Sequence, residues 1–141
     1  MLIIGNDHAG TDLKFQLTSW FTESKLDFVN KGTDSSDSVD YPDFAKAVCD
    51  AVLSDKSNIG VLICGSGNGI AMSANKYPGI RAAICWNAEL ASLAKQHNDA
   101  NVLVLPARFI STNEGLSIMK AFLEAKFEGG RHQNRVNKIG C

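Results

Sequence analysis

Residues 61–70 read VLICGSGNGI, an apolar run that ends at Cys64 and continues into three glycines spaced one residue apart. A short apolar run bounded by a turn signal predicts a buried strand. Glycines at alternate positions predict a tight loop in which the backbone can approach another group closely. The stretch therefore predicts a strand that delivers a thiol to a glycine-rich loop, and this loop is the first candidate for a functional site.

The composition fits one domain of ordinary size. The chain has 141 residues, 45% of them apolar, which suffices for a single hydrophobic core spanning residues 1–141. A net charge of -1 gives no reason to expect nucleic acid or a membrane surface as a partner. The longest apolar runs have about five or six residues, far fewer than the roughly twenty of a membrane span. The start MLIIG carries no sign of a signal peptide, so we expect a cytoplasmic protein.

Four cysteines, Cys49, Cys64, Cys85 and Cys141, are spaced by 15, 21 and 56 residues and form no CxxC pair. This spacing predicts neither a disulfide framework nor a zinc site. Cys49 and Cys85 lie within apolar patterns and are expected to be small buried hydrophobic residues. Cys64 differs because it is the last residue before a loop.

Short apolar runs alternate with helical patterns along the whole chain. Strands are predicted at residues 2–5, 26–29, 59–64, 81–85 and 102–105. Helices are predicted at residues 11–22, 42–52, 69–76 and 111–127, after Asn87, and as a short segment in the tail. Strands that are apolar throughout, each followed by a helix, predict an α/β protein. The expected fold is a Rossmann-like, three-layer α/β/α sandwich around a five-stranded parallel sheet.

Several helix boundaries carry capping signals. Pro42 is typical of a first helical position, with Asp40 as a possible cap. Ser111 and Glu114 form a capping-box pattern, and Asn87 is expected to cap the helix that follows it. The residues expected on the buried face of that last helix are Leu90, Leu93 and Ala94.

An open parallel sheet binds its ligand beyond the carboxyl ends of the strands, where the strand order reverses. The first and third strands usually flank that point, so the loops at residues 6–10 (NDHAG) and 64–69 (CGSGNG) should face each other. One loop supplies a carboxylate and an imidazole. The other supplies a thiol, a hydroxyl and a row of backbone amides, which favour an anion.

Other interpretations of the glycine run exist. A dinucleotide fingerprint is a poor match, because the run lacks GxGxxG spacing and follows the third strand instead of the first. A glycine turn that only permits tight packing is about as plausible for the run by itself. The presence of Cys64 favours a site, because a thiol beside loop amides tends to have a lowered pKa.

The histidines and arginines outside this loop also have structural alternatives. His8 follows Asp7, which could form an Asx turn that caps the first helix. His97 could simply end the preceding helix, where the helix dipole favours it. Arg131 and Arg135 share one face of the tail helix, which is more often a solvated face. With few carboxylates nearby, however, they could bind a phosphate dianion.

Five ordered strings of the sequence together resemble one family: GNDHAG, VDYPDFA, LICGSGNGIAMSANKYPGIRAA, HNDANVLVLPAR and FEGGRHQNRV. The family is that of the B-type ribose-5-phosphate isomerases, which is grouped with allose- and galactose-6-phosphate isomerases. The resemblance runs from the first strand to the tail. It implies a homodimeric α/β/α enzyme of the pentose phosphate pathway that uses no cofactor and no metal and interconverts aldose and ketose phosphates.

The resemblance also implies roles for individual residues. Cys64 would be the base that moves a proton between C2 and C1, assisted by Ser66 through a hydrogen bond. His97 would open the furanose ring, and Asn98 would hold sugar hydroxyls. The amides of Gly65, Ser66, Gly67, Asn68 and Gly69 would stabilise the enediolate oxygens. The remaining substrate-binding positions would be Asp7 and His8, with Arg108, Arg131 and Arg135 as phosphate ligands.

The order of the elements adds a prediction about assembly. His97 precedes the fifth strand and should therefore lie near the amino ends of the strands, at the edge opposite to Cys64. We expect His97 and Asn98 to face Cys64 of another subunit in a twofold dimer, or in a dimer of such dimers, with residues 128–141 at the interface.

The substrate remains open at this point. Some relatives use a glutamate base in the helix after the loop, but here Met72 and its neighbours are not acidic, which favours a cysteine base. Ribose 5-phosphate is the first choice of substrate, followed by allose 6-phosphate or another hexose 6-phosphate. A sugar-phosphate-binding regulator without catalysis is the alternative from a different class.

Overall fold

The apolar strands form one parallel sheet with the order β2-β1-β3-β5-β4 in the computed structural model, which describes residues 1–140. In register, Ile4 of β1 pairs with Val61 of β3, and Val61 pairs with Leu103 of β5. The strands are β1 (Leu2–Asn6), β2 (Phe28–Asn30), β3 (Ile59–Cys64), β4 (Ala82–Ile84) and β5 (Val102–Pro106). The predicted five-stranded parallel sheet is confirmed.

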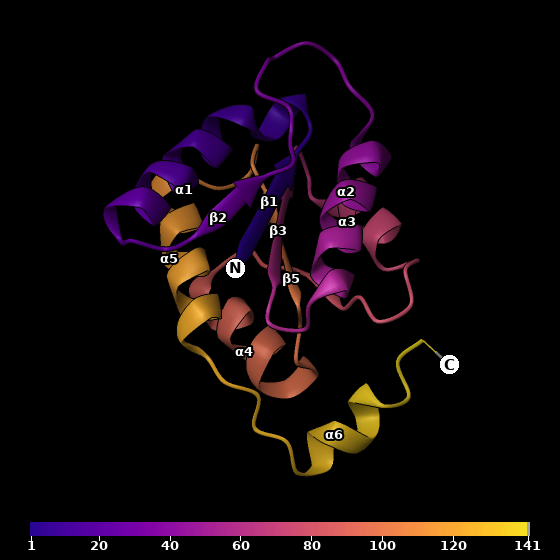
Figure 1. The fold of residues 1–141 in the computed structure, drawn as a ribbon. Coiled ribbons are helices and arrows are strands. Elements are labelled where there is room, and N and C mark those ends of the chain that lie inside the picture. Colours follow the sequence, from indigo (N-terminus) through magenta and orange to yellow (C-terminus); the bar gives the residue numbers. More distant parts are fainter. Residues whose placement is uncertain (141) are drawn as a thin grey trace.

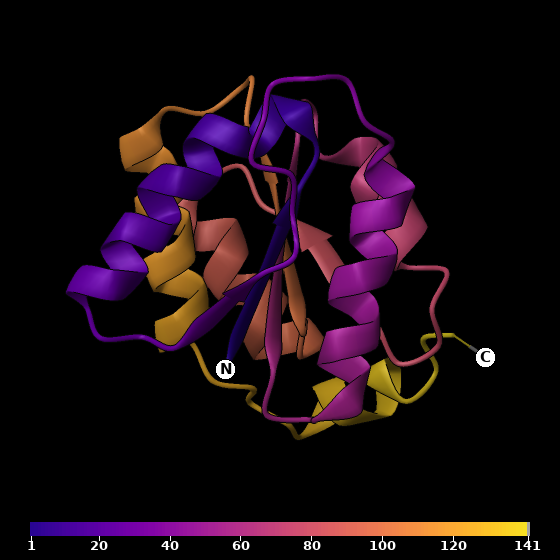
Figure 2. The same ribbon diagram turned by 45° about the horizontal axis from the view of Figure 1, so that its top comes forward.

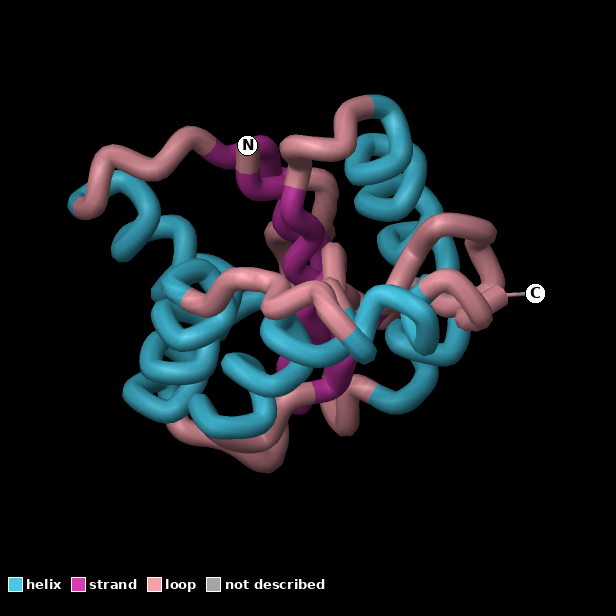
Figure 3. Tube along the Cα trace, turned by 90° about the horizontal axis from the view of Figure 1, so that it is seen from below, coloured by secondary structure: helices cyan, strands magenta, loops and turns pink. Residues whose placement is uncertain are grey.

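Helices cover both faces of this sheet, so the predicted three-layer arrangement is also confirmed. Figures 1 and 2 show α1, α4 and α5 on one side and α2 and α3 on the other. Seen along the strands in Figure 3, the sheet runs between the two groups. The helices are η1 (His8–Gly10), α1 (Thr11–Glu23), α2 (Tyr41–Ser54), α3 (Asn68–Ala74), α4 (Ala88–Asn98), α5 (Thr112–Glu124) and α6 (Arg131–Val136). None of the described helices is long and apolar enough to cross a membrane.

Alternation of side chains along the central strands creates two hydrophobic clusters. Val61 and Ile63 of β3 belong to the cluster under α1, α4 and α5. Leu62 and Cys64 belong to the cluster under α2 and α3. Because successive strand residues point to opposite faces, the position of Cys64 at the end of β3 directs its side chain towards α3.

Local capping signals predicted the helix starts well. Asn87 accepts a hydrogen bond from the amide of Leu90 at 2.9 Å, and both halves of the capping box between Ser111 and Glu114 are formed. The start of α2 differs slightly from the prediction. Tyr41 precedes the proline as the first helical residue, and Asp40 makes no side-chain capping bond.

Other details of the helices also differ from the prediction. The buried residues of α4 are Ala91 and Ala94, whereas Leu90 is 43% exposed, because the stripe facing α5 is narrow and Leu90 lies outside it. Helix α5 ends at Glu124, since Ala125 adopts an extended conformation, with ψ of 148°. The short η1 turn at His8–Gly10 was not predicted.

A long polar loop, residues 31–40, is anchored beside the carboxyl ends of the strands. The fully buried Lys14 donates hydrogen bonds to the carbonyl of Thr33 and to the carboxylate of Asp34. Asn6, also fully buried, donates to the same Thr33 carbonyl at 3.1 Å. These bonds satisfy the buried ammonium group and hold the loop against the first βα connection.

Asp34→Asn is expected to lower the free energy of unfolding at neutral pH by about 1 kcal/mol. This is below the usual range for a hydrogen bond to a charged group because the carboxylate is 64% exposed. The hydrogen bond from Lys14, and then that from Asn30, holds the pKa of Asp34 below its ordinary value of 3.8. A lowered folded-state pKa gives stabilisation that is complete above the ordinary value and is lost as the pH falls through the folded-state value.

Urea denaturation at a series of values from about pH 7 to about pH 3 measures this effect. The difference between wild type and Asp34→Asn should shrink at the acid end. Asp37→Asn is the matched control, because Asp37 lies in the same loop and its carboxylate makes no hydrogen bond to residues 1–140. A difference that stayed constant with pH would contradict the assigned role of the carboxylate.

Candidate active site at the carboxyl ends of β1 and β3

The strand order reverses between β1 and β3. The chain continues from β1 to β2 on one side, while β3 is followed along the sheet by β5 and β4 on the other. The loops after β1 and β3 leave the sheet side by side, since Asn6 pairs with Ile63 and the amide of Asp7 donates to the carbonyl of Ile63 at 3.1 Å. The two loops therefore start at the same edge of the sheet, as predicted.

Cys64 is the last residue of β3 and is 5% exposed, so the thiol lies at the base of the loop and is largely covered. The other two described cysteines are also buried, as predicted. Burial raises the pKa of Cys49 to about 11 and that of Cys85 to about 12. Their thiols stay protonated at neutral pH, so neither can act as a base. Cys141 lies outside the described residues.

The glycine loop after Cys64 depends on its glycines in two ways. Gly67 has a φ of 79°, a left-handed conformation that side chains with a Cβ rarely adopt. A methyl group at position 65 would lie 3.2 Å from Nη1 of Arg108, so the guanidinium group lies directly over the loop. The amides of Gly65, Ser66 and Gly67 donate no hydrogen bond within the described chain, which leaves them free for a ligand.

Ser66 has a local partner that differs from the predicted one. Its Oγ accepts a hydrogen bond from the amide of Asn68 at 3.2 Å. Among the described residues, no hydrogen bond links Ser66 to Cys64. The hydroxyl therefore shapes the start of α3 in this structure, and its proton can still be donated to a ligand.

Asp7 and His8 have structural roles that do not use all of their polar atoms. Oδ1 of Asp7 accepts from the amide of Ala9 at 2.9 Å, which is the Asx turn considered above. Nδ1 of His8 accepts from the amide of Val39 at 3.2 Å, so a neutral ring carries its proton on Nε2. Within residues 1–140, Oδ2 of Asp7 and Nε2 of His8 have no hydrogen-bond partner, and both can contact a substrate.

Tyr41 is a residue of this site that the sequence analysis did not select. A methyl group at position 69 would lie 2.5 Å from Cζ of Tyr41, so the phenol ring packs directly on Gly69. Tyr41 is 39% exposed. The signal was present in the string VDYPDFA, but the neighbouring Pro42 explains that string as a helix start, and nothing local links Tyr41 to the loop.

A second group of predicted residues lies at the opposite edge of the sheet. His97 and Asn98 end α4, immediately before the segment that enters β5, and Arg131 and Arg135 belong to α6. Figure 1 shows α6 and the adjoining end of α4 beyond the amino ends of the strands. A single chain therefore does not bring His97 to Cys64, as the order of the elements predicted.

The arginines fall into two kinds. Arg81 is used within the fold, since its guanidinium group donates to the carbonyls of Asn98 and Asp99 and pairs with the Asp99 carboxylate at 3.3 Å. The other arginines have no carboxylate partner among the described residues. They are Arg108, Arg131 and Arg135, the three predicted phosphate ligands.

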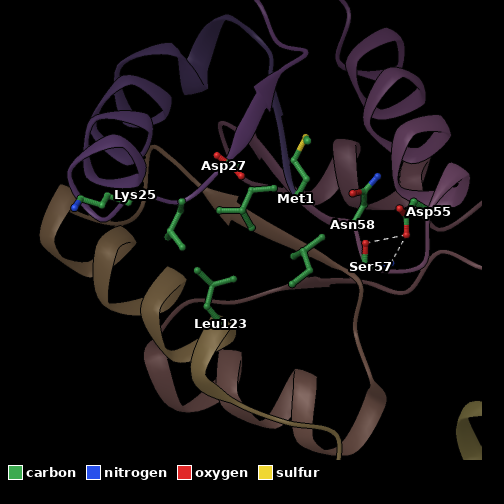
Figure 4. Close-up of a pocket in the computed structure, with 10 residues that line it drawn as sticks. Met1, Lys25, Asp27, Asp55, Ser57, Asn58 and Leu123 are labelled. Carbon is green, nitrogen blue, oxygen red and sulfur yellow. Dashed lines mark hydrogen bonds between the residues drawn. The ribbon is translucent and has the colours of Figure 1, made fainter.

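Two pockets lie away from the predicted site residues at either edge of the sheet. The first, of about 540 Å³, opens near the amino ends of β1 and β3 and is drawn in Figure 4, where Asp55 and Ser57 form one wall and Lys25 lies on the opposite side. The second, of about 440 Å³, lies between the end of α2 and Arg81. Neither pocket is lined by a predicted site residue. The candidate site is therefore assigned from the strand order and from the chemistry of its side chains, and not from pocket volume.

The fold and the loop define an α/β protein with a thiol-bearing candidate site at the switch point of a parallel sheet. The chain matches the model of the family described as Ribose/Galactose Isomerase over residues 2–139. A probable ribose-5-phosphate isomerase B of Mycoplasma pneumoniae is 42% identical over 139 residues, covering 98% of this chain and 91% of the relative. Ribose-5-phosphate isomerase B of Escherichia coli is 42% identical over 138 residues, covering 98% and 93%.

Comparison with solved structures indicates the same family as the sequence relatives do. Ribose 5-phosphate isomerase of Thermotoga maritima has a TM-score of 0.96 at 43% identity, covering 98% of this chain and 95% of that chain. Ribose-5-phosphate isomerase B of Mycoplasma genitalium, with bound ribulose-5-phosphate, has a TM-score of 0.95 at 42% identity, covering 98% and 92%. The chain therefore belongs to the ribose/galactose isomerase family, and the resemblance to the B-type ribose-5-phosphate isomerases is confirmed.

Proposed function

We propose that this chain interconverts ribose 5-phosphate and ribulose 5-phosphate in the cytoplasm. The observation that carries the proposal is the similarity to the Mycoplasma genitalium isomerase, which holds ribulose-5-phosphate and has a TM-score of 0.95 to this chain. The chemistry at the end of β3 supports it, because Cys64 is followed by loop amides with no partner in the described chain.

In the proposed reaction, the thiolate of Cys64 takes the proton from C2 of the open-chain aldose. The electron pair forms an enediolate, and the free amides of Gly65, Ser66 and Gly67 stabilise its oxygens as preorganised donors. The thiol then returns the proton to C1, while a hydroxyl proton moves from O2 to O1. No oxidant and no reductant is consumed, because hydrogen only changes its position within the sugar.

His97 is proposed to open the furanose ring as an acid and base, with Asn98 binding sugar hydroxyls. Since His97 lies at the opposite edge of its own subunit, we place it at Cys64 of the partner in a twofold dimer, with the tail at the interface. The surface beside the Cys64 loop supports this assembly. Trp86 and Phe109 follow β4 and β5, are 47% and 61% exposed, and contact each other with ring centroids 5.6 Å apart. Exposed apolar surface of this kind commonly marks an interface.

Arg135→Ala is expected to raise KM with little change in kcat, because a phosphate contact that is equal in ground and transition states acts on binding. The expected increase is roughly tenfold or more, the effect of losing one hydrogen bond to a charged group. Steady-state kinetics with ribose 5-phosphate measures it. Lys138→Ala removes an exposed cation just beyond α6 and should leave KM near the wild-type value. A fall in kcat at constant KM would contradict the phosphate role of Arg135.

The function itself is tested by comparing turnover of ribose 5-phosphate, allose 6-phosphate and galactose 6-phosphate by the purified protein, with and without a chelator. Ribose 5-phosphate should give the highest kcat/KM, and the chelator should not lower it. Preferred turnover of a hexose phosphate would reassign the substrate. Binding of all three without turnover would identify a regulator instead of an enzyme.

A further inference from the structure

Three side chains with metal-binding donors meet where the tail returns to α4. Nε2 of His97 lies 3.6 Å from Oε1 of Glu128, and the rings of His97 and His132 stack with centroids 4.2 Å apart and planes 10° from parallel. One donor atom from each of the three residues lies within 4.8 Å of the other two. No other group of this kind occurs among residues 1–140.

The backbone brings these residues together from two distant parts of the sequence. The amide of Glu128 donates to the carbonyl of Gln96 at 3.0 Å, which fixes the start of the tail against the last turn of α4. Gly129 and Gly130 follow with φ values of 66° and 55°. This left-handed turn, which glycine adopts at little cost, directs His132 in the first turn of α6 back onto His97.

The donor set suits a divalent transition metal ion. Imidazole nitrogens and one carboxylate oxygen, with water in a fourth position, are a common ligand set for Zn²⁺. In such a tetrahedral site the donor atoms lie roughly 3.3 Å apart, since each is about 2 Å from the ion. The side chains of His97 and Glu128 are 39% and 47% exposed. The stacked rings of His97 and His132 have to turn out of their parallel arrangement before both can direct a nitrogen at one ion. The partly exposed side chains of His97 and Glu128 can make this rotation.

The charged side chains around the cluster include one that attracts a cation and two that repel it. Glu128 contributes one negative charge within the cluster. Arg131 and Arg135 contribute positive charges from the same short helix, and both are exposed in the single chain, where water and salt screen them. We expect a site of moderate affinity and not a structural metal centre.

We propose that His97, Glu128 and His132 form a binding site for a divalent transition metal ion such as Zn²⁺, and that the bound ion inhibits the enzyme by occupying His97. The inhibition rests on the proposed ring-opening role of His97, whereas the binding does not. The metal is therefore an inhibitor at this position and takes no part in the reaction.

Direct titration of the purified protein with Zn²⁺, by calorimetry or by competition with a coloured chelator, tests the binding. Wild type should bind one ion per chain at this site. His132→Ala and Glu128→Gln should each weaken binding roughly tenfold or more, since loss of even an outer partner of a metal site costs 10–100-fold. Glu124→Gln, at an exposed carboxylate that ends α5, is the matched control and should bind as wild type does. Equal affinity in all four proteins would overturn the proposal.

Thiols are the competing zinc ligands in this chain, and Co²⁺ distinguishes them, because thiolate ligation gives an intense charge-transfer band that nitrogen and oxygen ligands do not give. Because the partner's Cys64 faces His97 in the proposed dimer, the Co²⁺ spectrum is compared in Cys64→Ser, which should lack this band and still bind the ion. A strong thiolate band that survives His132→Ala and disappears in Cys64→Ser would show that the metal binds at the wrong place, and would overturn the site.

Inhibition is measured as isomerase activity against Zn²⁺ concentration, with each variant compared to its own rate in chelator. Wild type and Glu124→Gln should be inhibited and should recover on chelation, while Glu128→Gln should need roughly tenfold or more Zn²⁺. Binding at the cluster without inhibition would support the site and refute the assigned role of His97. Absence of binding in an active enzyme would overturn the site and leave the proposed function intact.

Discussion

Replacement of Cys64 by alanine is expected to abolish isomerisation while leaving the sugar phosphate bound. Removal of the proposed base for proton transfer between C2 and C1 should lower kcat by roughly 10²–10⁴-fold or more, the usual contribution of a positioned acid or base. The proposed phosphate ligands are other side chains, the arginines without carboxylate partners among the described residues, so the dissociation constant should change little. Calorimetry with ribose 5-phosphate measures binding, and a coupled assay measures turnover.

Cys49→Ala is the matched control for this experiment. Cys49 is fully buried in the same hydrophobic cluster as Cys64, and burial raises its pKa to about 11. Its loss should reduce stability slightly, by about 1 kcal/mol for a small cavity, without a comparable fall in kcat. Persistent turnover by Cys64→Ala would show that another group is the base.

Mixtures of two inactive variants are expected to regain activity. Cys64→Ala and His97→Ala should each be nearly inactive as homodimers. If each site combines Cys64 of one chain with His97 of the other, a mixed dimer contains one intact site and one doubly defective site. Random pairing makes half of the dimers mixed, so a refolded equimolar mixture should show roughly one quarter of the wild-type activity.

The control for complementation is a mixture of Cys64→Ala with Cys64→Ser, in which no pairing can create an intact site. This mixture should stay inactive. Two results would contradict the shared site: an equimolar mixture of Cys64→Ala and His97→Ala that forms mixed dimers but has no activity, or a wild-type monomer with full activity in solution.

Much of the fold could be predicted because its signals are local. The apolar run of β3 was predicted with the observed bounds, Ile59–Cys64, and the caps at Asn87 and Ser111 were also found. Each of these features depends on a few neighbouring residues, through side-chain periodicity or a hydrogen bond to a nearby amide. Predictions that depended on tertiary packing were less accurate. Leu90 was expected inside and is exposed, because the neighbouring helix and not the pattern of α4 decides which face is covered.

In the candidate site, too, the features set by local sequence could be predicted and those set by tertiary packing could not. The thiol, the glycines and the Asx turn at Asp7 were visible in the sequence, since each lies within one short loop. Tyr41 was missed, because its contact with Gly69 joins residues 28 positions apart and only the packing of α2 against α3 creates it.

The sequence by itself determined the alternation of strands and helices, the thiol at the head of a glycine loop, and membership of an isomerase family. Only the tertiary structure decided which of these groups meet. It placed Arg108 over Gly65, and it gathered His97, Glu128 and His132 into one cluster at the opposite edge. The physical reason is that strand order and helix packing set distances between residues far apart in the chain. The glycine loop at residues 64–69 is therefore fixed locally, while its partners are fixed by the fold.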